Sequence, residues 1–192
     1  MLGEDGDMAI AWTTVSAPAP IEALTVGASA DGSVVHVGFG DAPGGVREAA
    51  RRLGEDLVAD PERTAPVVAQ LTEYLAGTRR VFDLDIDWRA TSGTQRTVLQ
   101  TLFAGVGYGE TISYGELAIR CGAFDEHWAA ARGVGSIMGS NPIPVIVPCH
   151  RVLAAARPNR LTLGGFGGGR AAKEWLLALE GVLTPALDFD AS

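Results

Sequence analysis

The chain has 192 residues, of which 47% are apolar, and a formal net charge of −8. This length suits one large or two small domains with a buried core. No run of 18 apolar residues occurs, which excludes a membrane-spanning helix, and the acidic start lacks the basic and apolar regions of a secretory signal. We therefore expect a cytoplasmic protein whose two cysteines, Cys121 and Cys149, are free thiols.

The first half alternates between strand-like and helix-like patterns. These predict a disordered tail over 1–11, strands over 23–27 and 34–39, helices over 46–58 and 64–76, and a half-buried strand over 81–88. Asp31-Gly32 is a hairpin-turn signal between the first two strands. The alternating aspartates of 81–88 also allow a metal site, but we expect all three to face solvent. The three histidines do not stand at ligand spacing from a cysteine pair, so no metal is expected.

The second half is predicted to be mainly helical, with helices over 95–104, 113–121 and 126–138. Ser113 is expected to cap the middle helix, with Glu116 three residues later as its capping-box partner. Helix, short turn and helix form a helix-turn-helix pattern. The last of these helices is rich in small residues, which permits tight helix packing or a close approach to a nucleic acid.

Cys149 and His150 stand together after the apolar run from Ile143 to Val147, which predicts a buried strand. A thiol is only slightly ionised near neutral pH, and an adjacent base raises the thiolate fraction. Neighbouring side chains of a strand point to opposite faces, so His150 needs a turn or a bridging water to reach the sulfur. A buried cysteine is alternatively a small apolar filler. The pair alone does not decide between these interpretations.

Six motifs in order extend from about Gln95 to Gly181. They are Tyr108-Gly109-Glu110-Thr111, Ser113-Tyr114-Gly115-Glu116-Leu117-Ala118, Ala131-Arg132-Gly133-Val134-Gly135, Asn141-Pro142-Ile143 with Val147-Pro148-Cys149-His150-Arg151-Val152, Gly165-Phe166-Gly167-Gly168-Gly169, and Lys173-Glu174-Trp175-Leu176-Leu177 with Glu180. In these motifs the chain resembles the O6-alkylguanine-DNA alkyltransferases. The resemblance implies an α/β (α+β) fold: a ribonuclease-H-like scaffold domain over 12–90, a DNA-binding, winged-helix-like domain over 94–185, and a tail over 186–192.

The resemblance also implies a reaction, in which the alkyl group of O6-alkylguanine, or of O4-alkylthymine, moves from duplex DNA to Cys149 once per molecule. It assigns His150 as the base acting through water, Glu180 as its orienting carboxylate, and Asn141 as a brace of the turn before the cysteine. A minor-groove contact and base flipping fall to Tyr114, Ala131, Arg132, Gly135 and Arg151. The guanine pocket falls to Val147, Pro148, Phe166 and Gly167. No cofactor or metal is implied, and a monomer is expected.

Some positions depart from the family pattern. Phe166 stands where tyrosine is common, Gly133 where alanine is usual, and Gly139 where a basic or polar residue often occurs. The stretch from Val152 to Gly164 is several residues longer than the family norm, and its Arg157 and Arg160 are expected to assist the DNA contact. From Gly115 to Trp175 seven basic residues face four acidic ones, so the acidic remainder predicts weak DNA binding.

Two other functions fit parts of this pattern. A non-catalytic relative that flags alkylated bases would bind the same DNA, but such relatives lack the nucleophile that Cys149 supplies. A cysteine hydrolase could use Cys149, His150 and Glu180 as a triad. The adjacent order of cysteine and histidine and the arginine-bearing helix disfavour the hydrolase.

Overall fold

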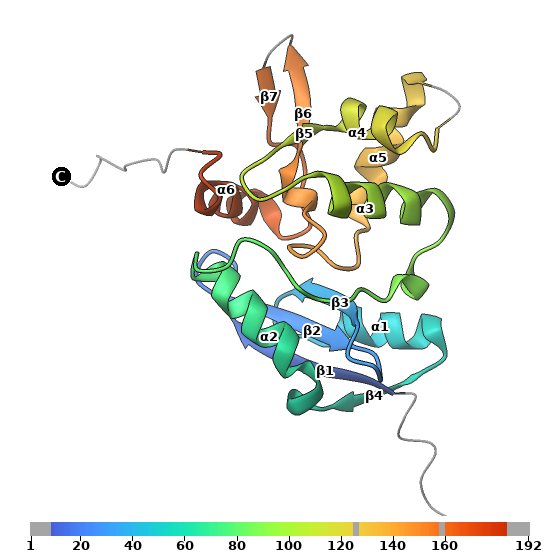
Figure 1. Ribbon diagram of the computed structural model, residues 1–192, viewed down its shortest axis with the longest axis vertical. Helices are drawn as coiled ribbons and strands as arrows, with labels where there is room; N and C mark the ends of the chain where they lie inside the picture. Colours follow the sequence, from blue (N-terminus) through green and yellow to red (C-terminus); the bar gives the residue numbers. More distant parts are fainter. Residues whose placement is uncertain (1–8, 125–126, 158–159, 184–192) are drawn as a thin grey trace, which may run out of the picture.

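A computed structural model describes residues 9–124, 127–157 and 160–183 and shows a mixed α/β protein (Figure 1). The N-terminal half contains β1 (Ala9–Ser16), β2 (Ala23–Ala28), β3 (Val34–Phe39), α1 (Gly44–Leu53), β4 (Asp56–Ala59) and α2 (Pro61–Leu75). The strands form one sheet in the order β3-β2-β1-β4, antiparallel except for the parallel pair β1 and β4. The Asp31-Gly32 turn joins β2 to β3 as predicted.

The C-terminal half contains α3 (Gly93–Gly105), β5 (Ile112–Ser113), α4 (Tyr114–Cys121), α5 (His127–Gly139), β6 (Val152–Arg157), β7 (Arg160–Thr162) and α6 (Gly169–Leu179). Short 3-10 turns, η1 (Trp88–Ala90) and η2 (Cys149–Arg151), precede α3 and β6. The capping box of α4 is confirmed: the hydroxyl of Ser113 accepts from the N–H of Glu116, and the carboxylate of Glu116 accepts from the N–H of Ser113. No helix of the described residues is long and apolar enough to cross a membrane.

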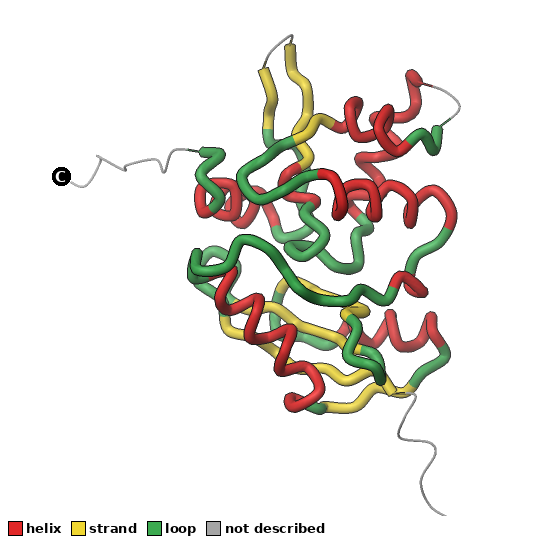
Figure 2. The backbone as a smooth tube through the Cα atoms, viewed as in Figure 1, coloured by secondary structure: helices red, strands yellow, loops and turns green. Residues whose placement is uncertain are grey.

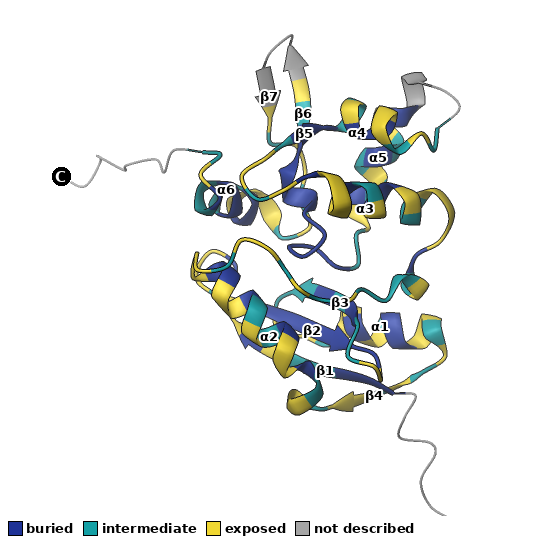
Figure 3. Cartoon of the chain, in the orientation of Figure 1, coloured by how far each residue is buried: buried dark blue, intermediate teal, exposed yellow. Residues whose placement is uncertain are grey.

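Both faces of the four-stranded sheet are covered, and one of the two cores continues into the other half. Helix α1 packs Val46 and Ala50 onto Ile10 and Val35 in a small cluster. On the other face, α2 adds its apolar side chains to a cluster that extends to Leu99 of α3 and Leu176 of α6. Figure 3 shows this buried side of α2 turned toward the sheet. The two halves therefore share a hydrophobic core.

Two predicted boundaries in the N-terminal half were wrong. Ala9–Ala11 are not a tail, because they form the start of β1 and are buried. The helix expected over 46–58 ends at Leu53, since Gly54 adopts a left-handed conformation with φ 71°. The residues after it form β4, which pairs in parallel with β1. The pairing of β1 with β2 and β4 determines where the tail ends and where the helix ends. Local sequence patterns do not reveal such long-range pairing.

Residues 81–88 are not a strand, although their exposure alternates as predicted up to Ile86. Only one isolated bridge forms, between Ile86 and Val34. Asp83 and Asp85 are exposed as expected, but the side chain of Asp87 is only 8% exposed because it pairs with Arg89 at 2.5 Å. The segment connects the two halves of the molecule and has no second neighbour to extend a ladder.

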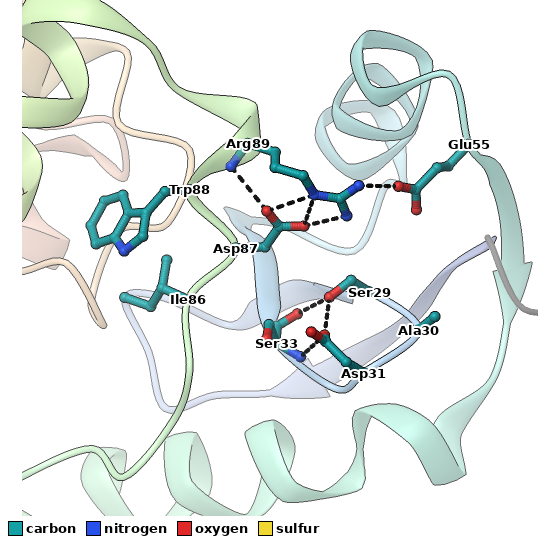
Figure 4. Close-up of a pocket in the computed structure, with 9 residues that line it drawn as sticks. All are labelled: Ser29, Ala30, Asp31, Ser33, Glu55, Ile86, Asp87, Trp88 and Arg89. Carbon is teal, nitrogen blue, oxygen red and sulfur yellow. Dashed lines mark hydrogen bonds and ion pairs between the residues drawn. The ribbon is translucent and has the colours of Figure 1, made fainter.

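The end of this connection is fixed by an ionic cluster at the rim of the sheet (Figure 4). Arg89 reaches Asp87 and, at 2.7 Å, the carboxylate of Glu55, while Ser29 donates to Asp31 at 2.7 Å in the hairpin turn. These groups line a pocket of about 350 Å³. The ion pairs of Arg89 anchor the connection to Glu55, just before β4. Backbone hydrogen bonds of Val34 with Asp85 and Asp87 attach it to the start of β3.

The buried strand expected over 143–147 was also wrong: the chain between α5 and η2 is an irregular loop (Figure 2). It folds back on itself, with the N–H of Val147 donating to the carbonyl of Ile143 at 2.9 Å and Val145 at φ 74°. Pro142, Pro144 and Pro148 lack N–H donors, so the segment cannot sustain a ladder. The loop is nevertheless buried, as expected for a segment that carries a nucleophile into the core.

Gly133 tests how α5 is packed. A Cβ at this position would lie 2.5 Å from the ring of Phe124, whereas a Cβ at Gly139 of the same helix would meet nothing within 4 Å. We expect Gly133→Ala to lower the free energy of unfolding by about 1–3 kcal/mol through overpacking, against its better helix propensity. Gly139→Ala should be neutral or stabilising by up to about 1 kcal/mol.

Urea denaturation of both variants measures the difference. Adding Phe124→Ala to Gly133→Ala should remove the clash, and so reduce the penalty that Gly133→Ala imposes. Equal stabilisation by the two single alanine variants would show that Phe124 does not rest on the helix.

Candidate active site

The loop before Cys149 is held in shape by Asn141. Its side-chain N–H donates to the carbonyl of Val147 at 2.9 Å, and its Oδ1 accepts from the N–H of Ile143 at 3.0 Å. Asn141 thereby spans the turn between α5 and η2. Cys149 opens η2 and is 3% exposed. The turn, not a strand, presents both Cys149 and His150.

The thiol of Cys149 lies in an apolar environment with two polar neighbours. Burial raises its pKa to about 11, and this is opposed by a hydrogen bond from Asn141 and by the charge of Lys173. Lys173, on α6, is fully buried and donates to the carbonyl of Val152 at 2.8 Å. Burial lowers the pKa of this amine to about 8. The resting thiol is thus largely protonated, and a base is needed to ionise it.

His150 is fully buried, and its two ring nitrogens differ in environment. Nε2 lies 3.0 Å from Oε1 of Glu180, whereas Nδ1 is a buried polar atom without a hydrogen-bond partner in the part of the chain that the structure describes. Because Glu180 can only accept from Nε2, the neutral ring carries its proton on Nε2. Burial lowers the pKa of His150, although Glu180 opposes this. The lone pair of Nδ1 is therefore available to accept a proton.

Glu180 is surrounded by donors from three separate segments. Oε1 accepts from Nη2 of Arg151 at 2.7 Å and from the hydroxyl of Tyr74 at 2.5 Å, and Oε2 accepts from the N–H of Gly109 at 3.3 Å. Burial alone would raise the pKa of Glu180, but the bonds from His150 and Arg151 outweigh it and bring the pKa to about 2. Glu180 is thus a charged, buried carboxylate.

The assignment of Arg151 to the DNA contact was wrong. Arg151 is only 6% exposed. Its guanidinium binds Glu180 and donates to the carbonyl of Val106 at 2.7 Å. Without a charged partner, the buried carboxylate of Glu180 would strongly destabilise the fold. The ion pair with Glu180 therefore keeps the guanidinium of Arg151 turned away from solvent. Its role is to support the site from within.

The residues expected to form the guanine pocket lie on two segments near the His150 ring. Val147 and Pro148 are buried, Phe166 is half-buried, and Gly167 is exposed with open space around it. The ring of Phe166 stands edge-on to that of His150, with centroids 6.3 Å apart. It also packs edge-on against Phe39 of β3 at 5.3 Å, so the N-terminal half contributes to this wall.

The residues expected to contact DNA divide into two groups. Tyr114, at the start of α4, is half-buried beside Gly135, whose Cβ would lie 3.9 Å from the Tyr114 ring. Burial and the charge of Cys149 raise the pKa of Tyr114. Ala131 and Arg132, by contrast, are exposed on α5. The side chains of Arg157 and Arg160, on β6 and β7, lie outside the described residues.

Comparisons with known proteins identify the family of this chain. Residues 93–182 match the family described as 6-O-methylguanine DNA methyltransferase, DNA binding domain. A methylated-DNA–protein-cysteine methyltransferase from Mycolicibacterium paratuberculosis is 46% identical over 127 residues, which are 66% of this chain and 71% of that protein. The chain belongs to the methylated-DNA–protein-cysteine methyltransferase family. A relative from Salmonella typhimurium is 43% identical over 59% of this chain and 61% of its own length.

Solved structures extend the likeness to both halves. The Mycobacterium tuberculosis OGT, solved in complex with DNA, superposes with a TM-score of 0.71 at 35% identity, covering 88% of this chain and 92% of that one. The O6-methylguanine-DNA methyltransferase of Pyrococcus kodakaraensis shares the fold, with a TM-score of 0.59 at 22% identity over 90% of this chain and 99% of that one. The N-terminal sheet therefore belongs to the family fold.

Sequence reasoning assigned no role to three side chains near Cys149 and His150: Tyr74, Phe39 and Lys173, the last of which it named only as part of a motif. Tyr74 stands within the helical apolar pattern of α2, and Phe39 within that of β3, where both are indistinguishable from ordinary core residues. Lys173 offered one signal, since it is the only lysine among 15 basic residues. A lysine retained against a strong preference for arginine indicates a position that requires a compact ammonium group.

Glu180 and Glu48 provide a matched test of the buried carboxylate, because both have a pKa of about 2 but only Glu180 is buried. The pKa of Glu180 is lower in the folded state than the usual value of 4.5, so its contribution to stability is complete above pH 4.5 and is lost as the pH falls towards 2. We expect Glu180→Gln to destabilise the protein at pH 7 by about 3–5 kcal/mol, since Arg151 loses its partner.

The same variant should lose less stability between pH 5 and pH 2.5 than the wild type. Glu48→Gln should follow the wild-type curve closely, because its ion pairs with Arg51 and Arg52 are screened by solvent. Urea midpoints measured across this pH range give both comparisons. An unchanged acid limb in Glu180→Gln would mean that another group controls acid unfolding.

Proposed function

We propose that this protein repairs DNA by transferring the alkyl group of O6-alkylguanine, and of O4-alkylthymine, to its own Cys149. The observation that carries the proposal is the pairing of a buried thiol with an adjacent imidazole whose Nδ1 has no partner among the described residues. Buried polar atoms normally have a hydrogen-bond partner, and exceptions indicate a functional site. Membership of the family supports alkyl transfer as the reaction of this pair.

The proposed chemistry begins with ionisation of Cys149. Its proton passes through a bridging water to Nδ1 of His150, and the carboxylate of Glu180 stabilises the imidazolium through Nε2. The thiolate then attacks the alkyl carbon, so that a sulfur–carbon bond forms while the bond from carbon to O6 breaks. The electron pair of that bond leaves with guanine, which takes up the proton that the thiol lost.

The product explains why one event per molecule is expected. Thiol–disulfide exchange requires a disulfide sulfur as its target, and a thioether offers none. A cysteine hydrolase would need its covalent intermediate to be released by water, and many such enzymes hold a thiolate–imidazolium pair at rest. Here burial raises the pKa of Cys149 and lowers that of His150, which favours two neutral partners before the substrate arrives.

The DNA contact is proposed to lie on α4 and α5, which pack against each other as the two helices of a helix-turn-helix. In this arrangement α5 enters the minor groove, Arg132 occupies the space of the flipped base, and Tyr114 turns the nucleotide toward Cys149. Ala131 and Gly135 keep the helix surface slim. The N-terminal half is proposed to be a ribonuclease-H-like domain, and the protein to act as a cytoplasmic monomer.

Intact mass tests the acceptor and the stoichiometry. After incubation with duplex DNA containing O6-methylguanine, the mass should rise by one methylene, about 14 Da, and no further with excess substrate. Cys121→Ser should react like the wild type, because Cys121 lies at the end of α4 and donates only to the carbonyl of Ala118. Labelling that persists in Cys149→Ser, or repeated turnover, would refute the proposal.

Arg132→Ala separates base flipping from chemistry. We expect transfer from duplex DNA to slow by at least about tenfold, while the reaction with free O6-benzylguanine stays near the wild-type rate, because the free base needs no extrusion. Single-turnover rate constants on both substrates provide the measurement. Equal losses on the two substrates would place Arg132 in the fold instead of the base stack.

A further inference from the structure

The hydroxyl of Tyr74 reaches the active site from the N-terminal half of the molecule. Tyr74 lies in the last turn of α2 and is fully buried. Its Oη donates to Oε1 of Glu180 at 2.5 Å and lies 3.3 Å from Nε2 of His150, residues that follow it by 106 and 76 positions. A residue of the first half thus contacts both polar partners of the nucleophile.

Tyr74 binds the same carboxylate oxygen of Glu180 that contacts His150. Oε1 of Glu180 accepts from Nε2 of His150 at 3.0 Å, from Tyr74 and from Nη2 of Arg151 at 2.7 Å. Oε2 accepts from Nε of Arg151 at 3.0 Å and from the N–H of Gly109 at 3.3 Å. The phenol therefore fixes the position of Oε1 opposite Nε2. Together with Arg151, it compensates the negative charge that Oε1 presents to the imidazole.

We propose that Tyr74 is a positioning residue for the alkyl-transfer reaction, in which its hydroxyl orients Glu180 and moderates the charge that this carboxylate presents to His150. The inference rests on the proposed function. It assigns to the N-terminal half a part in the chemistry, where the sequence predicted a scaffold only.

The direction of the effect follows from the groups around His150. These are Glu180 at the end of α6, Arg151 of η2, Lys173 of α6, Cys149 and Tyr74 itself. Burial and the charge of Glu180 raise the pKa of Tyr74 far above its usual value, so the phenol keeps its proton and remains a donor. Without it, Oε1 would carry more uncompensated charge and would hold a proton on His150 more strongly.

Tyr108 supplies a matched control. Its hydroxyl donates to the carbonyl of Leu179, the residue before Glu180, at 2.8 Å, and its ring packs edge-on against that of Tyr74 at 6.1 Å. Tyr108→Phe and Tyr74→Phe each remove one tyrosine hydroxyl that bonds to the C-terminal end of α6. Only Tyr74→Phe removes a donor from Glu180. Both variants keep the aromatic ring, so packing is preserved.

The experiment uses the full chain and follows His150 directly. The sequence contains three histidines, His36, His127 and His150, so ring signals in NMR titrations can be assigned with single His→Gln variants. We expect Tyr74→Phe to shift the titration of His150 upward by roughly one pH unit, since a bond to a charged group is lost. His36, whose pKa is lowered to about 4 by burial, serves as an internal reference that should not move.

The same shift should appear in the reaction with free O6-benzylguanine. The acid limb of its pH–rate profile should move upward by the same amount, so that below the limb Tyr74→Phe reacts about tenfold more slowly than the wild type. Tyr108→Phe should match the wild type in both measurements.

Three outcomes would overturn the proposal: no shift in Tyr74→Phe, a downward shift, or an equal shift in Tyr108→Phe. A downward shift would mean that the hydroxyl accepts from Nε2 instead of donating to Glu180. The titration does not require alkyl transfer. If the wild type transferred no alkyl group while His150 still shifted upward, the proposed function would fail and the link from Tyr74 to His150 would stand.

Discussion

The buried carboxylate of Glu180 is the constraint on which the active site depends. Its side chain is fully inaccessible, and it stands at the C-cap of α6, where the helix dipole disfavours a negative charge. Such a group is tolerated only with several donors. Arg151, His150 and Tyr74 provide them from η2 and α2, so the charge that α6 cannot support by itself joins three distant segments. The orientation of His150 is a consequence of satisfying this carboxylate.

Contacts that do not involve Glu180 also join the two halves of the protein. The N–H of Val37 in β3 donates to the carbonyl of Pro142 at 3.0 Å, within the loop that leads to Cys149. Phe39 of the same strand packs on Phe166, and a Cβ at Gly168 would lie 2.6 Å from the Phe39 ring. Together with Tyr74 of α2, these contacts bring the N-terminal half against the segments that carry Cys149, His150 and Glu180. The shared core therefore fixes the N-terminal half next to the proposed site.

The sequence predicted correctly those elements that depend on interactions between residues close together in the chain. The capping box at Ser113 and the apolar stripe of α3 predicted their helices correctly. The order of the motifs led to Cys149, His150 and Glu180, and the fold brings His150 and Glu180 into contact. The strands expected over 81–88 and 143–147 failed because a strand depends on a distant neighbour and on free N–H groups. Arg151 was misplaced for a related reason: charge suggests exposure, and only the fold reveals a buried partner. Tyr74 carried no signal, since its polar atom is used 106 residues away.

The hydrogen bonding of the buried polar side chains sets His150 apart from the others. Among the described residues, the carboxylate of Glu180, the guanidinium of Arg151 and the ammonium of Lys173 all have partners within the protein, and Nδ1 of His150 is the buried side-chain polar atom that has none. A fold that provides donors for a charge as deep as Glu180 could also cover one imidazole nitrogen. In the proposed reaction, this open Nδ1 is the base that takes the proton of the neighbouring Cys149. The network from Tyr74 to Glu180 then holds that base in place without consuming its lone pair.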